Sequence, residues 1–200
     1  MERRHLETAA AKYSCLRGLL ALPGGALFIL GALGNWKVGP FRHAWAFLAA
    51  VVVLGAVWLA LSRYYTDNYG RLNPSPRQQA RLGVALAVAV ALMIGGSLLL
   101  RSRAAWSLDL PVNAIAVSFA LVMLITYAVS VGLRPYHVVI WGGVLVAGAL
   151  PVWDGPDPSN VGLVLAGLGM MVTGLFDHRA FVQTFGAPGA LRLEDGDVGV

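Results

Sequence analysis

Residues 44–61 read AWAFLAAVVVLGAVWLAL, an unbroken apolar run of 18 residues without a charged side chain or a histidine. A helix rises about 1.5 Å per residue, so the run is nearly as long as the hydrocarbon core of a bilayer, about 30 Å, is thick. Backbone groups in lipid must be paired within the protein, and the strands of a membrane barrel would alternate apolar and polar residues. The run therefore predicts a transmembrane helix.

Five further runs have the same character, at residues 16–33, 82–100, 112–131, 138–153 and 161–176. The last two have only 16 residues each, and we expect Tyr136, Trp141 and Trp153 to anchor them at the membrane interfaces. The whole chain of 200 residues is 58% hydrophobic and only 12% charged, against about 25% charged in a soluble domain. We predict an all-α, polytopic integral membrane protein with six transmembrane helices in a compact bundle with short loops.

The basic residues indicate how this bundle is oriented. With six spans, eleven Lys and Arg residues lie on the side of the two termini and four on the other side. The positive-inside rule then places both termini in the cytosol of a plasma membrane, which we take to be a bacterial inner membrane. The predicted divisions are an interfacial N-terminal segment (1–15), the transmembrane domain (16–176) and a cytosolic segment with a disordered acidic tail (177–200). A cleaved signal peptide is the alternative for the first run, although no Ala-x-Ala site follows it.

Several kinds of chemistry are missing from the sequence. Apart from Arg17 at the start of the first run, no span contains an ionisable Asp, Glu, Lys, Arg or His, which disfavours ion-coupled transport and catalysis at mid-membrane. Hydroxyls such as those of Ser118, Thr126 and Ser130 are expected to serve helix packing, either by bonding back to the carbonyl four residues earlier or by bonding to another helix. We predict no catalytic residue, cofactor or metal. The net charge of +5 is assigned to loops facing an anionic leaflet rather than to nucleic-acid binding.

Small residues indicate where helices pack closely. Gly162, Ala166, Gly169 and Thr173 recur on one face of the last span, a pattern that favours packing inside the bundle over a dimer interface. Pro23-Gly24-Gly25 predicts a kink or unwound turn in the first span, and broken helices can line substrate sites.

Polar residues gather on the predicted cytosolic side, in the loop after the second span, at the start of the fifth span and after the sixth. The candidate binding residues are Arg63, Tyr64, Tyr65, Tyr69, Arg71, Arg77, Arg134, Asp177, His178 and Arg179, which we call the cytosolic Arg/Tyr surface. Arginine forks match phosphate and carboxylate oxygens, so this surface could bind an anionic headgroup or an acidic patch of a partner. Membrane insertion alone would also require such charges and aromatic rings.

One cluster in this region has residue types that bind metals or transfer protons. Asp177, His178 and His137 could together hold zinc or act as acid and base. Nothing in their spacing brings the two histidines together, so the sequence does not predict that site.

Three functions follow from these features. The first is a non-catalytic accessory or scaffold subunit that docks a membrane or cytosolic partner, a second copy of the chain or anionic lipid. The second is a permease-like component for an apolar or lipid-like substrate, suggested by the broken first helix. The third is an interfacial enzyme acting on lipid headgroups through Asp177 and His178.

Overall fold

The fold was analysed in a computed structural model, which describes residues 13, 16–70, 80, 83–84, 87, 91, 95, 112–130, 132–150 and 158–186. Every regular element in this part of the chain is helical, as predicted. The elements in order are η1 (Gly18–Leu20), α2 (Ala21–Asn35), η2 (Gly39–Arg42), α3 (Ala44–Tyr69), α5 (Ala114–Ser130), α6 (Pro135–Ala149) and α7 (Pro158–Phe185).

Three helical segments in the described ranges are long and apolar enough to cross a membrane: Gly18–Asn35, Ala44–Tyr69 and Ser159–Phe185. Helices α5 and α6 are also apolar but shorter. The predicted span 82–100 lies mostly outside the described residues, and the five of its residues that are described are all helical. The count of six spans is therefore not confirmed.

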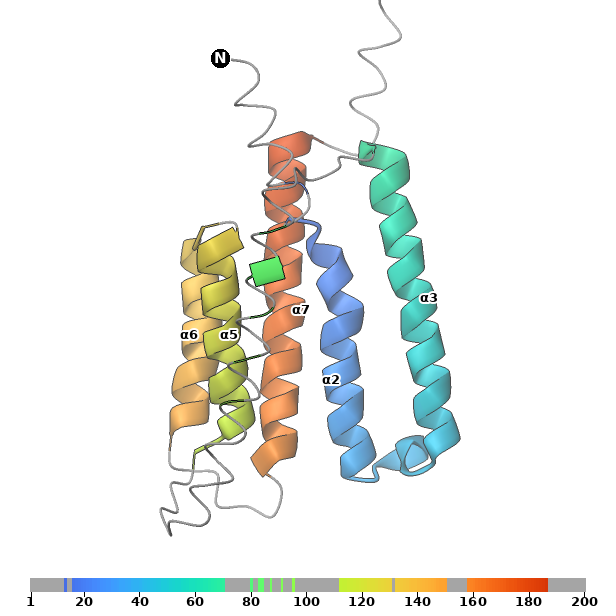
Figure 1. Ribbon diagram of the computed structural model, residues 1–200. Coiled ribbons are helices and arrows are strands. Elements are labelled where there is room, and N and C mark those ends of the chain that lie inside the picture. The colour runs from blue at the N-terminus through green and yellow to red at the C-terminus, as the bar shows by residue number, and fades with distance from the viewer. Residues whose placement is uncertain are drawn as a thin grey trace, which may run out of the picture.

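Helix α7 is the centre of the arrangement (Figure 1). It contacts α2 on one side and the α5–α6 hairpin on the other, while α3 contacts mainly α2 and lies outermost. One end of the bundle contains the last residues of α3 and α7 and the first residues of α2 and α6, and we call it the Asp177 end. The opposite end carries the turn between α2 and α3, and we call it the η2 end.

Glycines let α7 approach its neighbours on two faces. On the predicted face, Gly162, Ala166, Gly169 and Thr173 are all buried, and a Cβ at Gly169 would lie 2.9 Å from the Trp141 ring of α6. A second face, which the sequence did not single out, meets α2: a Cβ on Gly167 would lie 2.6 Å from the Gly25 carbonyl oxygen. Both contacts show internal packing, as the sequence favoured for the first of the two faces.

The predicted break at Pro23-Gly24-Gly25 is wrong. A short 3-10 turn, η1, precedes α2, and α2 then runs without interruption from Ala21 to Asn35. Pro23 falls in the first turn of α2, where backbone N–H groups have no partner within the helix, so proline removes no hydrogen bond there. The glycines serve close packing against α7 instead.

Two helices extend beyond the apolar runs that predicted them. Helix α3 continues past residue 61 to Tyr69, and α7 continues through Asp177 to Phe185. The reason is packing at the Asp177 end, where Tyr65, Tyr69 and Phe181 are buried in one aromatic cluster with Tyr13. The ring centroids of Tyr69 and Phe181 are 4.7 Å apart.

The hydroxyls of α5 take one of the two arrangements that the sequence left open. Ser118, Thr126 and Ser130 each donate to the carbonyl four residues earlier in the same helix. Asn113 caps α5 instead, because its Oδ1 accepts the Ala116 N–H at 3.1 Å. Its backbone N–H donates to the Gly148 carbonyl at 2.7 Å and thereby joins the start of α5 to the end of α6.

The turn at the η2 end begins with a Schellman motif at the end of α2. The Val38 N–H donates to the Leu33 carbonyl at 3.0 Å and the Lys37 N–H to the Gly34 carbonyl at 3.1 Å. Lys37 has a φ of 55°, the left-handed conformation that this motif requires and that glycine usually supplies. The chain then reverses its direction through η2 and enters α3.

Candidate functional site

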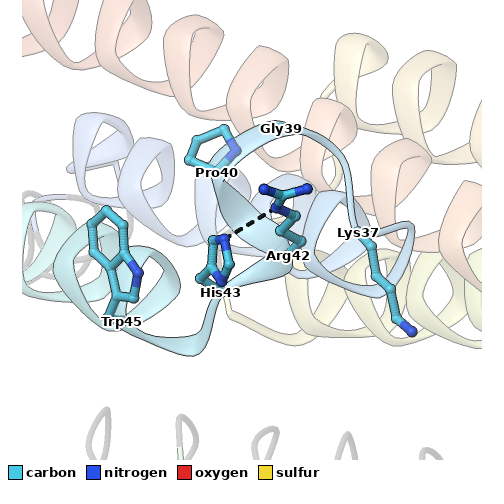
Figure 2. A pocket seen from close by; sticks show the side chains of 6 residues that line it. All are labelled: Lys37, Gly39, Pro40, Arg42, His43 and Trp45. Carbon is cyan, nitrogen blue, oxygen red and sulfur yellow. Dashed lines mark hydrogen bonds between the residues drawn. The ribbon is translucent and has the colours of Figure 1, made fainter.

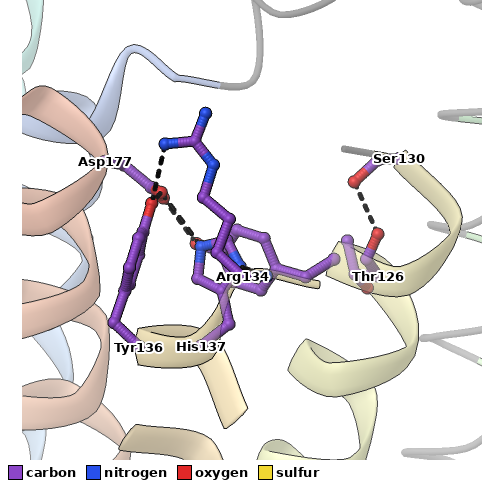
Figure 3. Close-up of polar contacts among 7 residues, drawn as sticks. Thr126, Ser130, Arg134, Tyr136, His137 and Asp177 are labelled. Atoms are coloured by element: carbon purple, nitrogen blue, oxygen red, sulfur yellow. Dashed lines mark hydrogen bonds and ion pairs between the residues drawn. The ribbon is translucent and has the colours of Figure 1, made fainter. Parts of the chain in front are cut away.

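The most deeply buried acidic group in the described part of the chain is Asp177, on α7, whose residue is 2% exposed. Its Oδ1 accepts from the Tyr136 hydroxyl at 2.6 Å and from His137 Nε2 at 3.0 Å. Its Oδ2 accepts from the Tyr127 hydroxyl at 3.0 Å. Three donors from α5 and α6 therefore converge on one carboxylate of α7, and they compensate the loss of water around it. We call these four residues the Asp177 cluster (Figure 3).

The hydrogen bonds of His137 define its tautomer. Its Nδ1 accepts the backbone N–H of Arg134 at 3.2 Å, so the ring proton is on Nε2 and is donated to Asp177. The imidazole is fully buried and stacks on the Tyr127 ring with the centroids 3.8 Å apart. Both ring nitrogens are thus already bonded within the protein.

A positive charge lies one hydroxyl away from the carboxylate. Arg134 precedes α6, and its Nη1 donates to the Tyr136 hydroxyl at 3.4 Å, while that hydroxyl donates to Asp177. Arg134 is half-buried, so the guanidinium borders the cluster without contacting the carboxylate directly. A hydrogen-bonded path of this kind partly offsets the cost of burying the carboxylate.

His178, the next residue on α7, faces the other half of the bundle. Its Nδ1 is 2.9 Å from the Tyr65 hydroxyl of α3, and that oxygen also accepts the Leu19 N–H at 3.3 Å. The Tyr13 hydroxyl donates to the Tyr65 carbonyl at 3.1 Å and to the Gly70 carbonyl at 2.7 Å. Burial raises the pKa of the Tyr13 hydroxyl, which keeps it protonated as a donor.

Arg17 completes this second group. Its guanidinium lies 5.1 Å from the Tyr65 ring centroid and 5.7 Å from that of Tyr13, and its Nη2 donates to the Ser62 carbonyl at 3.2 Å. These contacts tie the start of η1 to the last turns of α3. Asp177 and His178 therefore attach opposite halves of the bundle to one point on α7.

The structure unites only part of the predicted cytosolic Arg/Tyr surface. Tyr65 meets His178, and Tyr64 and Tyr69 pack in the same aromatic cluster, while Arg134 borders the Asp177 cluster. Arg63 and Arg179 are exposed, and neither makes a hydrogen bond or ion pair in the described part of the chain. The remaining candidates, Arg71 and Arg77, lie outside the described residues.

Sequence reasoning named His137 with Asp177 as a hypothetical cluster, but the candidate binding residues included none of Tyr127, Tyr136 and His137. The available signal was their position: Tyr127 lies near the predicted inner end of one span, and Tyr136-His137 begin the next. A short connection makes such helices antiparallel neighbours, so these three residues had to lie close together. Their common partner on α7 could not be read from spacing.

The arrangement does not support a metal centre made from both histidines. His137, on α6, bonds to Asp177 of α7, whereas His178 of α7 bonds to Tyr65 on α3. Among the described residues, no group of three or more His, Cys, Asp or Glu side chains is close enough to hold a metal ion.

Comparison of the chain with protein-family models, curated proteins and solved structures finds no match.

Proposed function

We propose that this chain is a non-catalytic accessory or scaffold subunit of a membrane, which docks an acidic patch of a partner protein, or anionic lipid, through its cytosolic Arg/Tyr surface. The observation that carries the proposal is the double bonding of His137, to the Arg134 N–H and to Asp177. A general acid or base needs a nitrogen or oxygen within reach of substrate, and this imidazole has none to offer. The Asp177 cluster then serves to hold helices together.

The exposed arginines provide the docking chemistry. Arg63 near the end of α3 and Arg179 near the end of α7 are both exposed, and both helices end at the Asp177 end of the bundle. Their guanidinium groups have no hydrogen-bond or ion-pair partner among the described residues. An arginine in this state can form bidentate bonds with a carboxylate or a phosphate.

The test compares complexes extracted in mild detergent after chemical crosslinking in native membranes. We expect the chain to carry a stoichiometric partner that is lost from the variant Arg63→Gln/Arg179→Gln. The matched control, Arg101→Gln/Arg103→Gln, removes two charges from a loop on the opposite predicted side and should retain the partner. Purification of the wild type without any partner, or equal loss from both variants, would contradict docking of a protein at this surface.

We also propose that the termini lie in the cytosol of a plasma membrane, a bacterial inner membrane. In a background in which Cys15 is changed to serine, single cysteines at positions 63 and 37 should react with a membrane-impermeant maleimide from opposite sides. Labelling of position 63 in intact cells would show that the chain has the opposite orientation.

The two other functions have less support. The permease hypothesis depended mainly on a broken first helix, and α2 is continuous. The enzyme hypothesis required Asp177 and His178 to act on one substrate, whereas they face different helices. Glycine contacts between α2 and α7 also bring those two helices too close together for a ligand passage along that seam.

A further inference from the structure

A second cationic feature lies at the η2 end, away from the cytosolic Arg/Tyr surface. A cavity of about 400 Å³ is lined by Lys37, Gly39, Pro40, Arg42, His43 and Trp45 (Figure 2). None of these residues is acidic, so the two basic side chains have no carboxylate to neutralise them within the lining. A site with this charge favours an anion.

The contact between Arg42 and His43 prepares the arginine for a ligand. Arg42 Nε donates to His43 Nε2 at 3.0 Å, and the dashed line in Figure 2 joins the two groups. The acceptor in this bond is the imidazole Nε2. This bond uses only Nε, so both terminal nitrogens of the guanidinium remain available to oxygens of a ligand.

An apolar groove adjoins the cationic cavity. Its volume is about 520 Å³, and its lining includes Gly31 and Gly34 of α2, Phe47 and Leu48 of α3, and Arg42, which the two cavities share. The groove runs between two helices that are apolar enough to cross a membrane. A ligand that fills both cavities must have an anionic head and a hydrocarbon tail.

The backbone of Lys37 is an independent indication. The Schellman motif at the end of α2 holds this residue at a φ of 55°, where glycine is favoured and a side chain is disfavoured. Strained residues of this kind cluster at functional sites. Here the side chain adds a second cation to the cavity that contains Arg42.

We propose that the η2 end binds an anionic phospholipid, with its phosphate between Lys37 and Arg42 and an acyl chain in the groove along Gly31 and Leu48. Trp45, which is 68% exposed, then lies at headgroup depth, where tryptophan is enriched in membrane proteins. The protein would recognise the lipid headgroup by its charge and the acyl chain by its shape.

The experiment uses the full chain in neutral detergent with a photoactivatable phosphatidylglycerol, and the crosslinked peptides are mapped by mass spectrometry. We expect crosslinks within residues 31–48 that unlabelled phosphatidylglycerol displaces and phosphatidylcholine does not. Lys37→Gly/Arg42→Gln should reduce them by roughly tenfold, as the loss of charge-assisted bonds implies. Lys37→Gly should also raise the unfolding temperature, because glycine relieves the left-handed backbone, so the loss cannot be attributed to misfolding.

The acyl groove has its own test. Gly31→Leu should reduce crosslinking, because the space where its Cβ would project holds no atom within 4 Å and a leucine would fill the groove without displacing the protein. Gly55→Leu on α3 is the matched control, since its Cβ also meets nothing within 4 Å. Arg101→Gln/Arg103→Gln controls for the loss of two charges and should leave the crosslinks unchanged.

Three results would overturn the proposal. The first is crosslinking at residues 31–48 that persists in Lys37→Gly/Arg42→Gln. The second is equal displacement by phosphatidylcholine. The third is displacement by inorganic phosphate as effective as that by phosphatidylglycerol, which would show a simple anion site. Crosslinks at residues 62–70 or 177–186 report on the cytosolic Arg/Tyr surface and are scored separately, so the two proposals can fail independently.

Discussion

Replacing Asp177 tests whether its cluster holds the bundle together. In Asp177→Ala, the hydroxyls of Tyr127 and Tyr136 and the Nε2–H of His137 lose a shared charged acceptor that is itself 2% exposed. A buried donor left without its acceptor costs about 1–3 kcal/mol, and the three losses do not add fully because the donors share one carboxylate. We therefore expect Asp177→Ala to lower the free energy of unfolding by about 4 kcal/mol.

Asp177→Asn should cost about half as much, about 2 kcal/mol. Its amide oxygen can still accept from Tyr136 and His137, while its NH2 group faces the Tyr127 hydroxyl, which must rotate to accept a hydrogen bond. For a chain of this size, each kcal/mol lowers the unfolding midpoint by about 2–4 °C. The expected decreases are then about 8–16 °C for alanine and about 4–8 °C for asparagine.

The measurement is thermal unfolding in a neutral detergent, followed by tryptophan fluorescence. Trp141 is fully buried on α6, one turn after His137, and therefore reports on this part of the bundle. Arg179→Gln, on the same helix but exposed, is the control and should change the stability by less than about 0.5 kcal/mol. If Asp177→Ala unfolds within about 2 °C of that control, the cluster does not stabilise the bundle and our reasoning is wrong.

Three further outcomes are expected from the packing and capping contacts. Gly25→Ala should destabilise the protein by about 1–3 kcal/mol in the same unfolding assay, because its Cβ would lie 2.5 Å from a carbonyl oxygen of α7. The control Gly31→Ala should not destabilise it, because that Cβ meets nothing within 4 Å. Tyr65→Phe should expose the Nδ1 of His178 and raise its modification by diethylpyrocarbonate, measured by peptide mass spectrometry; an unchanged rate would contradict the hydrogen bond. Asn113→Ala should lower the unfolding free energy by about 1 kcal/mol through loss of the α5 cap, and Asn113→Ser, which keeps a capping oxygen, should recover part of it.

Much of the fold was predictable because its cause is local. In an apolar segment, every backbone N–H and C=O must find a partner nearby, and a helix supplies those partners within the segment itself. The class of fold and the approximate positions of five helices follow from this constraint. Small residues at helical spacing likewise predicted one of the two faces on which α7 packs.

Helix ends and partners at the Asp177 end depended on tertiary contacts. Hydropathy predicted that the last span stops at Phe176, yet α7 continues to Phe185 because Phe181 is buried against residues of α3. Hydropathy also could not show that Pro23 falls in a first turn, since that depends on where η1 gives way to α2.

The sequence by itself determined that this chain forms apolar helices and that its basic residues lie mainly in a few short segments. Only the tertiary structure decided that Asp177 faces Tyr127 and His137, which are 50 and 40 residues away, while His178 turns to Tyr65. The physical reason is range: hydrogen bonding along a helix is settled within four residues, whereas a buried carboxylate must be paired by whichever donors the packing of distant helices brings to it.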